Sequence, residues 1–285
     1  HKDPVHVRTT QSFLVRSRAD WLFGMNATQI MSSKKGELLR IGRVKAPTIK
    51  LVYDNSEAIA NFKPRNYYIL QANYGTFVSV LCNESDSPIP FDSPDECGTY
   101  PLKGVVSTVD TKRSYIHAPK LFDLTSAQAE AGRTFGYTPS KTLEVLQSLY
   151  ENHKVISYPR TQCRYVSSEK AKEFGMMLGH LSVFSDLTQV AENISLPDIQ
   201  KVLNDKNVVN DAEVMKESHD ALLPTSNRPV LSRMTEEERN ICHMIYTRLL
   251  AQFLPKAAED KTKAVILHGN GRFVATGKTV VEQGW

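Results

Sequence analysis

The feature that most limits the fold of this chain is a long helical stretch lying between two strand-rich stretches. Residues 48–119 are rich in β-branched and aromatic residues, and the same kind of sequence returns at residues 257–285. Residues 120–256 instead carry helix boundary signals and apolar residues at helical spacing. We therefore predict an α+β fold, in which an all-helical domain is inserted into a β-rich domain.

The individual elements follow from local patterns in the sequence. Period-two and β-branched patterns predict five strands, at Thr48 to Tyr53, Tyr67 to Cys82, Gly104 to His117, Lys263 to Leu267 and Gly271 to Val281. Boundary signals predict four helices, over residues 9–31, from a capping box at Thr125 to Gln128, from Pro139, and from Thr235 to a stop at Pro255.

Positive charge is concentrated at the start of the chain. Residues 1–50 carry ten Lys and Arg side chains against three Asp and Glu, so this stretch holds a charge of +7 while the whole chain is only +4. We assign residues 1–47 to a basic helical part, and the excess favours a polyanionic partner. Charge alone leaves open the alternative of an ordinary solvated surface.

Several classes of protein are disfavoured by composition. The apolar runs are too short to cross a bilayer and no signal-peptide pattern is present, so we expect a cytoplasmic protein without a membrane partner. The four cysteines form no Cys-x-x-Cys pair, which argues against a zinc site or a disulfide framework and leaves only a Cys82–Cys97 pair open. The chain starts without methionine and stops within a strand-like pattern, which suggests a piece of a longer protein.

Chemistry is most strongly suggested by the segment Ser157-Tyr-Pro-Arg-Thr161. A phenol has a pKa near 10 and needs a proton acceptor or a nearby cation to act as a nucleophile. Arg160, two residues after Tyr158, could hold two oxygens of a phosphodiester and stabilise the charge that develops on it. In isolation, however, a Tyr-Pro-Arg tripeptide such as residues 158–160 is more often a turn with a packed tyrosine.

Five separated motifs resemble one family, the type IA DNA topoisomerases, and most closely their topoisomerase III branch. The resemblance covers nearly the whole chain in order. The motifs are Arg16-Ser-Arg-Ala-Asp20 with the helix that follows, Ile41-Gly-Arg-Val-Lys-Ala-Pro-Thr48, Leu124-Thr-Ser-Ala-Gln128 with Thr142 to Tyr150, Val155 to Ser167, and Ser218-His-Asp-Ala-Leu-Leu-Pro-Thr225.

The resemblance implies a β-rich arch with an inserted helical domain of winged-helix or CAP-like type that carries the active-site tyrosine. It also implies cleavage of one DNA strand through a transient 5′-phosphotyrosyl link, passage of another strand, and religation. By position in the motifs, the catalytic residues are Tyr158 as nucleophile, Arg160 as its phosphate-stabilising partner, and His219. The DNA-binding residues implied are Arg16, Asp20, Arg43, Lys45, Arg164 and Thr225. For Arg16 and Asp20, a plain i,i+4 helix pair remains an alternative.

The sequence departs from the family pattern in three ways. Gln162 stands where the family usually has aspartate, and an amide cannot supply the same negative charge. Lys45 replaces a usual glutamine. The acidic Asp-x-Asp motif and the glutamate of the family's Toprim domain do not occur. We therefore expect no metal site or cofactor in this chain, magnesium in the full-length enzyme, and a monomeric fragment that is inactive without its Toprim domain. The expected partners are that domain and single-stranded DNA.

Two other interpretations use some of the same residues. A DNA-binding module without chemistry, built from helix-turn-helix elements, predicts duplex binding and tolerance of Tyr158→Phe. The topoisomerase interpretation instead predicts a preference for single strands. A tyrosine recombinase would need its arginines and histidine upstream of the tyrosine, whereas Tyr158 precedes His219; we discount it.

Overall fold

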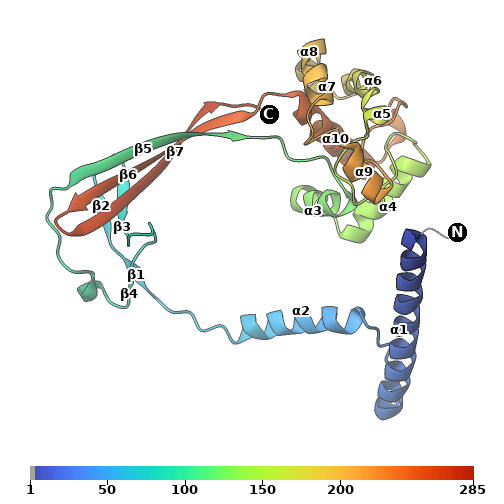
Figure 1. The fold of residues 1–285 in the computed structure, drawn as a ribbon, viewed down its shortest axis with the longest axis horizontal. Helices are drawn as coiled ribbons and strands as arrows, with labels where there is room; N and C mark the ends of the chain where they lie inside the picture. Colours follow the sequence, from blue (N-terminus) through green and yellow to red (C-terminus); the bar gives the residue numbers. More distant parts are fainter. Residues whose placement is uncertain (1–3) are drawn as a thin grey trace. The chain divides into compact units, whose positions relative to one another are not determined.

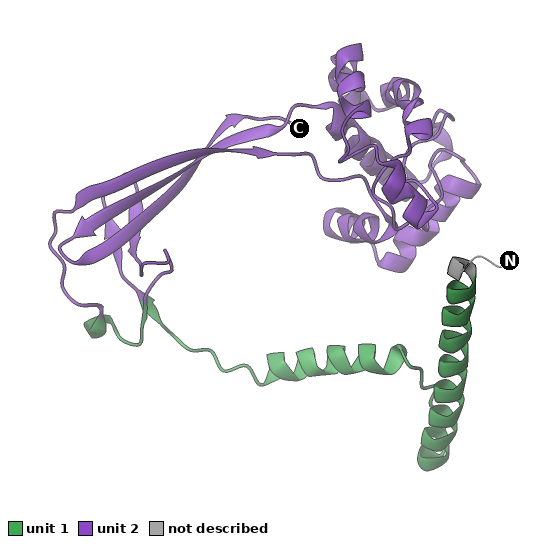
Figure 2. Cartoon of the chain, viewed as in Figure 1, with its two compact units in different colours: residues 1–68, 90–96 green, residues 69–89, 97–285 purple. Residues whose placement is uncertain are grey.

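The computed structural model describes residues 4–285, and these residues form two compact units (Figure 2). The first unit runs up to Tyr68 and includes Pro90–Glu96, and the second comprises Ile69–Ile89 and Cys97–Trp285. Helices and an antiparallel sheet occupy separate stretches of the chain. The fold is therefore α+β, as the sequence predicts.

The first unit is built on two helices, α1 (Pro4–Lys35) and α2 (Lys45–Ala60). The helix expected over residues 9–31 is confirmed within α1. Gly36, with φ of 72°, ends α1 in the left-handed region that glycine adopts without strain. The chain then turns back along α1, because the backbone N–H of Ile41 donates to Thr28 Oγ1 at 2.9 Å and that of Leu39 donates to Ser32 Oγ at 2.9 Å.

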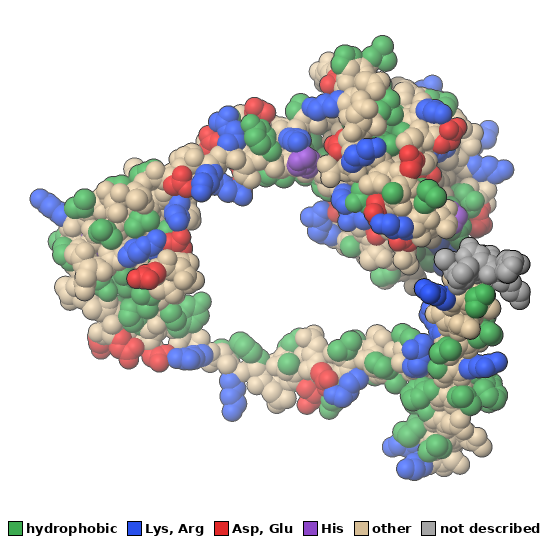
Figure 3. All heavy atoms as spheres, in the orientation of Figure 1, with side chains coloured by type: hydrophobic (Ala, Val, Ile, Leu, Met, Phe, Trp, Pro, Cys, Tyr) green, Lys and Arg blue, Asp and Glu red, His purple; other side chains and the backbone are tan. Residues whose placement is uncertain are grey.

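The prediction of a strand at Thr48 to Tyr53 was wrong, because these residues lie inside α2. Their β-branched content favours a strand only weakly, and local hydrogen bonds decide the outcome. The hydroxyl of Thr48 donates to the carbonyl of Val44 at 2.9 Å, and Lys50 forms an i,i+4 ion pair with Asp54. Figure 3 shows apolar and basic side chains next to one another along both helices, and none of the residues of α2 is buried.

The second unit contains a five-stranded antiparallel sheet in the order β2-β3-β7-β6-β5 (Figure 1). Its strands are β2 (Gln71–Asn73), β3 (Val78–Leu81), β5 (Val105–Ile116), β6 (Ala257–His268) and β7 (Gly271–Glu282). The strands expected at Gly104 to His117 and Gly271 to Val281 are confirmed. The strand expected at Lys263 to Leu267 is longer than predicted, beginning at Ala257.

The run expected as one strand from Tyr67 to Cys82 is broken into three short strands. β1 (Tyr68–Ile69) pairs with β4 (Pro90–Phe91) in a separate two-stranded sheet, and a 3-10 turn follows at Pro94–Cys97. β2 and β3 form a hairpin whose turn contains Gly75 at φ of 84°, a conformation that interrupts an extended strand.

All helices of the second unit lie between β5 and β6 in the chain, and these two strands pair directly (Figure 1). The hydrophobic core of this helical region includes the fully buried Phe122, Leu146, Phe174 and Tyr246. The elements are α3 (Leu124–Phe135), α4 (Pro139–Glu151), α5 (Ser168–Ala171), α6 (Phe174–Gly179), α7 (Ser185–Glu192), α8 (Leu196–Leu203), α9 (Asp211–Glu217), α10 (Glu236–Leu250), and 3-10 turns at His180–Val183, Leu231–Arg233 and Ala251–Phe253.

Local capping explains where the main helices begin. The helix starts predicted at Pro139 and at Thr235 are confirmed: Thr138 caps α4 with Pro139 in its first turn, and Thr235 forms a capping box with Glu238 at α10. The capping box predicted at Thr125 was wrong. Asp123 caps α3 instead, and its carboxylate accepts the backbone N–H of Ser126 at 2.7 Å. An aspartate two positions earlier offers an acceptor that is at least as good as a threonine hydroxyl.

Two further expectations concern the chain as a whole. Within residues 4–285, the structure contains no helix with the length and apolar character needed to cross a bilayer. Cys82 is buried as a free thiol, so it forms no disulfide with Cys97.

Candidate active site

The chain approaches Tyr158 through a strained turn followed by a buried extended segment. After α4, Lys154 adopts the left-handed conformation with φ of 57°, which is uncommon for a residue with a side chain. Its carbonyl accepts hydrogen bonds from Thr225 Oγ1 at 2.6 Å and Asn227 Nδ2 at 2.9 Å. Val155 and Ile156 are then buried, and these contacts fix the direction in which the chain reaches Tyr158.

His219 also follows a left-handed residue, in the second motif, Ser218 to Thr225. Ser218 ends α9 in the left-handed conformation, with φ of 65°, and His219 follows it directly. Asp220 accepts the backbone N–H of Ser167 at 2.5 Å. Pro224 then pairs with Ile156 in an antiparallel bridge, so the two motifs lie side by side.

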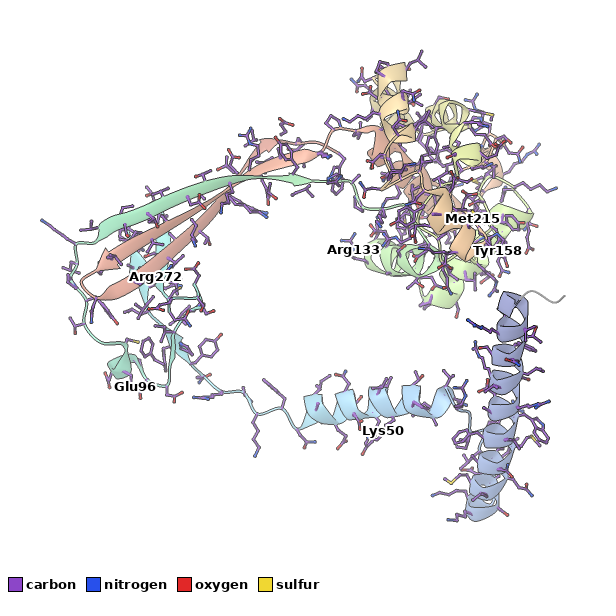
Figure 4. All side chains as sticks on the ribbon, viewed as in Figure 1. Lys50, Glu96, Arg133, Tyr158, Met215 and Arg272 are labelled. Carbon is purple, nitrogen blue, oxygen red and sulfur yellow. The ribbon has the colours of Figure 1, made fainter. Side chains whose placement is uncertain are left out.

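Tyr158 and His219 meet as a result of this pairing. Their ring centroids are 4.9 Å apart with the planes inclined at 45°, and Tyr150 of α4 lies 5.6 Å from Tyr158 on an edge-to-face contact. Tyr158 is 38% exposed, and His219 is also exposed. Figure 4 shows Tyr158 at the margin of the helical region. The phenol is thus held by its neighbours but remains open to a large substrate.

The residues after Tyr158 alternate between exposed and buried positions. Tyr158, Arg160 and Gln162 are exposed, whereas Pro159, Thr161 and Cys163 are buried. Thr161 is fixed because its carbonyl accepts the N–H of Leu124 at 3.0 Å. This alternation of burial leaves the side chains of Tyr158, Arg160 and Gln162 open to solvent, while Pro159, Thr161 and Cys163 anchor the segment to the helical region.

Arg160 is available to an outside ligand. No hydrogen bond or ion pair joins its guanidinium to another residue within 4–285. A free, exposed guanidinium two positions from the phenol suits an anionic group that spans both side chains. Gln162, in the place where the related motif has aspartate, lines an open pocket of about 270 Å³ together with Arg164 and Tyr165.

Arg164 and Thr225 contact backbone groups of the chain itself. Arg164 is half-buried, and its Nε donates to the carbonyl of Leu121 at 3.0 Å while its Nη2 donates to that of Lys120 at 3.4 Å. Thr225 holds the Lys154 carbonyl, as described above. The DNA-binding role predicted for both residues stays a prediction, and the structure gives each of them a clear part in fixing the loops around Tyr158.

The remaining predicted residues lie in the first unit, where three of them form one cluster. Asp20 accepts from Arg43 Nε at 2.6 Å and lies 4.0 Å from Arg16 Nε. The hydrogen bond from Arg43 is the main reason that the pKa of the Asp20 carboxyl is lowered, and the same bond raises the pKa of Arg43. Lys45 begins α2 and is exposed.

Two neighbours of Tyr158 were not singled out from the sequence. Tyr150 was named only as the last residue of the Thr142 to Tyr150 motif, although its ring contacts that of Tyr158. Ser157 was quoted in the motif without a role, yet its hydroxyl lies between the two motif segments. The sequence signal that could have identified Ser157 is that a small residue with a hydroxyl group directly precedes Tyr158. For metals, residues 4–285 bring no three His, Cys, Asp or Glu side chains together in a suitable group.

Comparisons with known proteins identify the family of this chain. A family model described as DNA topoisomerase matches residues 5–285, and the chain belongs to the type IA DNA topoisomerase family. Among curated relatives, "DNA topoisomerase 3" of Bacillus licheniformis is 34% identical over 282 residues and that of Bacillus subtilis 32% over 279, each match covering 96% of this chain. The chain spans only 38% of the length of each of these relatives.

A solved structure shows the same fold. The full-length topoisomerase I from Thermotoga maritima matches with a TM-score of 0.63 at 19% sequence identity, over 92% of this chain and 42% of that one. In each of these comparisons the match covers less than half of the other protein.

Proposed function

We propose that the protein carrying this chain is a DNA topoisomerase that cleaves one strand through a transient 5′-phosphotyrosyl link at Tyr158, passes another strand and religates the break. The observation that carries the proposal is the exposed Tyr158 ring lying 4.9 Å from the His219 ring, with the exposed Arg160 two positions away. Type IA membership supports the reaction class.

The proposed chemistry is a reversible exchange of phosphodiester bonds. The Tyr158 oxygen attacks phosphorus, a bond forms between them, and the bond from phosphorus to the 3′ oxygen breaks. The phenol loses a proton and the departing 3′ oxygen gains one, so no oxidant or energy source is consumed. Religation is the same step in reverse, with the 3′ hydroxyl attacking the phosphotyrosine.

Two neighbouring side chains have roles in this step. Arg160 donates to the non-bridging oxygens of the phosphate and stabilises the added negative charge of the transition state. His219 binds the same phosphate or moves a proton near the Tyr158 oxygen. Both side chains are exposed; the His219 ring lies 4.9 Å from that of Tyr158, and Arg160 is two residues from Tyr158 in the chain.

The rest of the enzyme is expected to lie in the part of the relatives that this chain does not span. We propose that a Toprim domain there holds magnesium, because the described residues offer no group that fits this ion. Single-stranded DNA is the proposed substrate. Arg16 and Arg43 of the first unit are proposed to contact its phosphates. The proposed location is the cytoplasm, at the chromosome, and the proposed state of the isolated chain is monomeric.

A relaxation assay tests this proposal. The 285-residue chain with magnesium should neither relax supercoiled DNA nor cleave single strands, and a longer protein that includes a Toprim domain should do both. Tyr158→Phe in the longer protein should abolish the covalent adduct while DNA binding persists. Failure of the longer protein to relax DNA, together with a preference for duplex DNA that Tyr158→Phe leaves unchanged, would instead favour the non-catalytic DNA-binding module.

A further inference from the structure

We propose that Ser157 is a positioning residue for the nucleophile, and that its hydroxyl sets the place of Tyr158 relative to His219. This inference rests on the function proposed above. It concerns a residue that does not touch the phosphate itself and acts through its neighbour in the chain.

The Ser157 hydroxyl is inserted between the two motif segments. The backbone N–H of Ser157 donates to the Leu223 carbonyl at 2.8 Å, as in an ordinary antiparallel pair. The N–H of Leu223, however, donates to Ser157 Oγ at 2.9 Å, and that hydroxyl donates onward to the Ala221 carbonyl at 2.9 Å. One side chain thus joins groups 64 and 66 positions away along the sequence.

The position of this hydroxyl explains how Tyr158 leaves the paired segment. In a regular antiparallel pair, the Leu223 N–H would bond to the Ser157 carbonyl. Because the hydroxyl takes that place, the two backbones separate directly after Ser157. Tyr158 is the next residue, and it therefore turns to the exposed edge where the His219 ring lies.

Removal of the hydroxyl would leave two buried groups without partners. Ala221 and Leu223 are both fully buried at 0% exposure, so water cannot replace the lost hydrogen bonds. The simplest repair is closure of the Leu223 N–H onto the Ser157 carbonyl, which shifts the following residue. Since His219 is fixed separately through Asp220 and Ser167, such a shift changes the spacing of Tyr158 and His219.

Kinetics of three variants test the proposal, in the longest natural protein that carries this chain. Ser157→Ala should slow covalent adduct formation on single-stranded DNA by about 10- to 100-fold, because small misplacements of a reacting group have effects of this size. Its affinity for the same DNA should be unchanged. Ser157→Thr keeps the hydroxyl and should restore the rate.

The matched control is Ser148→Ala. Ser148 is also a serine hydroxyl in a part-buried hydrogen bond, donating to Glu238 Oε1 at 2.6 Å between α4 and α10. Its loss should lower stability without slowing the adduct step. The proposal would be overturned if Ser157→Ala slowed adduct formation no more than Ser148→Ala does. It would also be overturned if Ser157→Thr formed the adduct as slowly as Ser157→Ala.

A second measurement keeps this inference separate from the proposed function. Failure of the unaltered protein to form a Tyr158-dependent adduct would refute the function. The positioning role is then decided by nuclear Overhauser contacts between labelled tyrosine and histidine rings. The Tyr158–His219 contact should disappear in Ser157→Ala and persist in Ser148→Ala and Ser157→Thr; its persistence in Ser157→Ala would refute the positioning role.

Discussion

Glu238 gives the most quantitative prediction, because one buried carboxylate joins two helices of the core. It accepts hydrogen bonds from Ser148 of α4 at 2.6 Å and from the backbone N–H of Thr235 at 2.8 Å, and it lies 3.2 Å from His153 Nε2. Its side chain is only 10% exposed. The replacement Glu238→Gln keeps the shape of the side chain but removes its charge.

The expected loss follows from the hydrogen bonds. Bonds to a charged group contribute about 1.5–3 kcal/mol and neutral ones about 0.5–1.5 kcal/mol. Weakening the bonds from Ser148 and Thr235, with partial retention by the amide oxygen, should lower the free energy of unfolding of the helical region by about 1–2 kcal/mol at neutral pH.

The pH dependence has a defined sign. Burial raises the pKa of Glu238, but the hydrogen bonds from Ser148 and Thr235 and the proximity of His153 outweigh burial and hold the pKa below its ordinary value. The carboxylate therefore contributes its full stabilisation above pH about 4.3, the ordinary pKa of glutamate. That contribution is lost as the pH falls through the lowered pKa of the folded state.

Hydrogen exchange at the backbone amides of α4 and α10 measures this loss, at neutral pH and at pH about 4. The control is Glu236→Gln, which removes an exposed charge from the same helical turn and should have a much smaller effect. Equal effects of the two variants, or a Glu238→Gln loss that grows as the pH falls, would refute the reasoning.

Three further predictions concern other parts of the chain. In the longer protein, Arg160→Ala should slow adduct formation by about 100-fold or more without weakening DNA binding equally, and a loss confined to affinity would contradict its role in the transition state. Arg43→Ala should reduce the slope of log affinity for single strands against log salt by about 0.7; an unchanged slope would show that Arg43 contacts no phosphate. The buried Tyr246 hydroxyl has no hydrogen-bond partner among residues 4–285, so Tyr246→Phe should leave stability unchanged or raise it by about 1 kcal/mol in urea denaturation, and a clear loss would reveal a missing partner.

Local signals explain which elements could be predicted from the sequence. The starts of α4 and α10 depend on side chains within three residues of each cap, so Pro139 and the Thr235 to Glu238 box identified them. The strand expected at Thr48 to Tyr53 failed for the opposite reason. Its composition favours strands, but no neighbouring strand pairs with it, and its hydrogen bonds form within one helix.

In the candidate site, too, features set by local sequence could be predicted and features set by contacts between distant segments could not. Tyr158, Arg160 and His219 were identified through their motifs, and the structure brings Tyr158 and His219 into ring contact. The hydrogen bonds made by the Ser157 hydroxyl could not be predicted, because they join residues that become neighbours only after the two motif segments pair. The contact of Arg43 with Asp20 similarly depends on how the chain turns back along α1.

The central claim is most directly tested by identifying the residue that becomes linked to DNA. The longer protein, incubated with 3′-labelled single-stranded DNA and magnesium and then denatured, should retain the labelled DNA fragment through its 5′ phosphate. Peptide mass spectrometry should place that phosphate on Tyr158, and Tyr158→Phe should show none. A link to another residue, a 3′-phosphate link, or cleavage that persists in Tyr158→Phe would contradict the account.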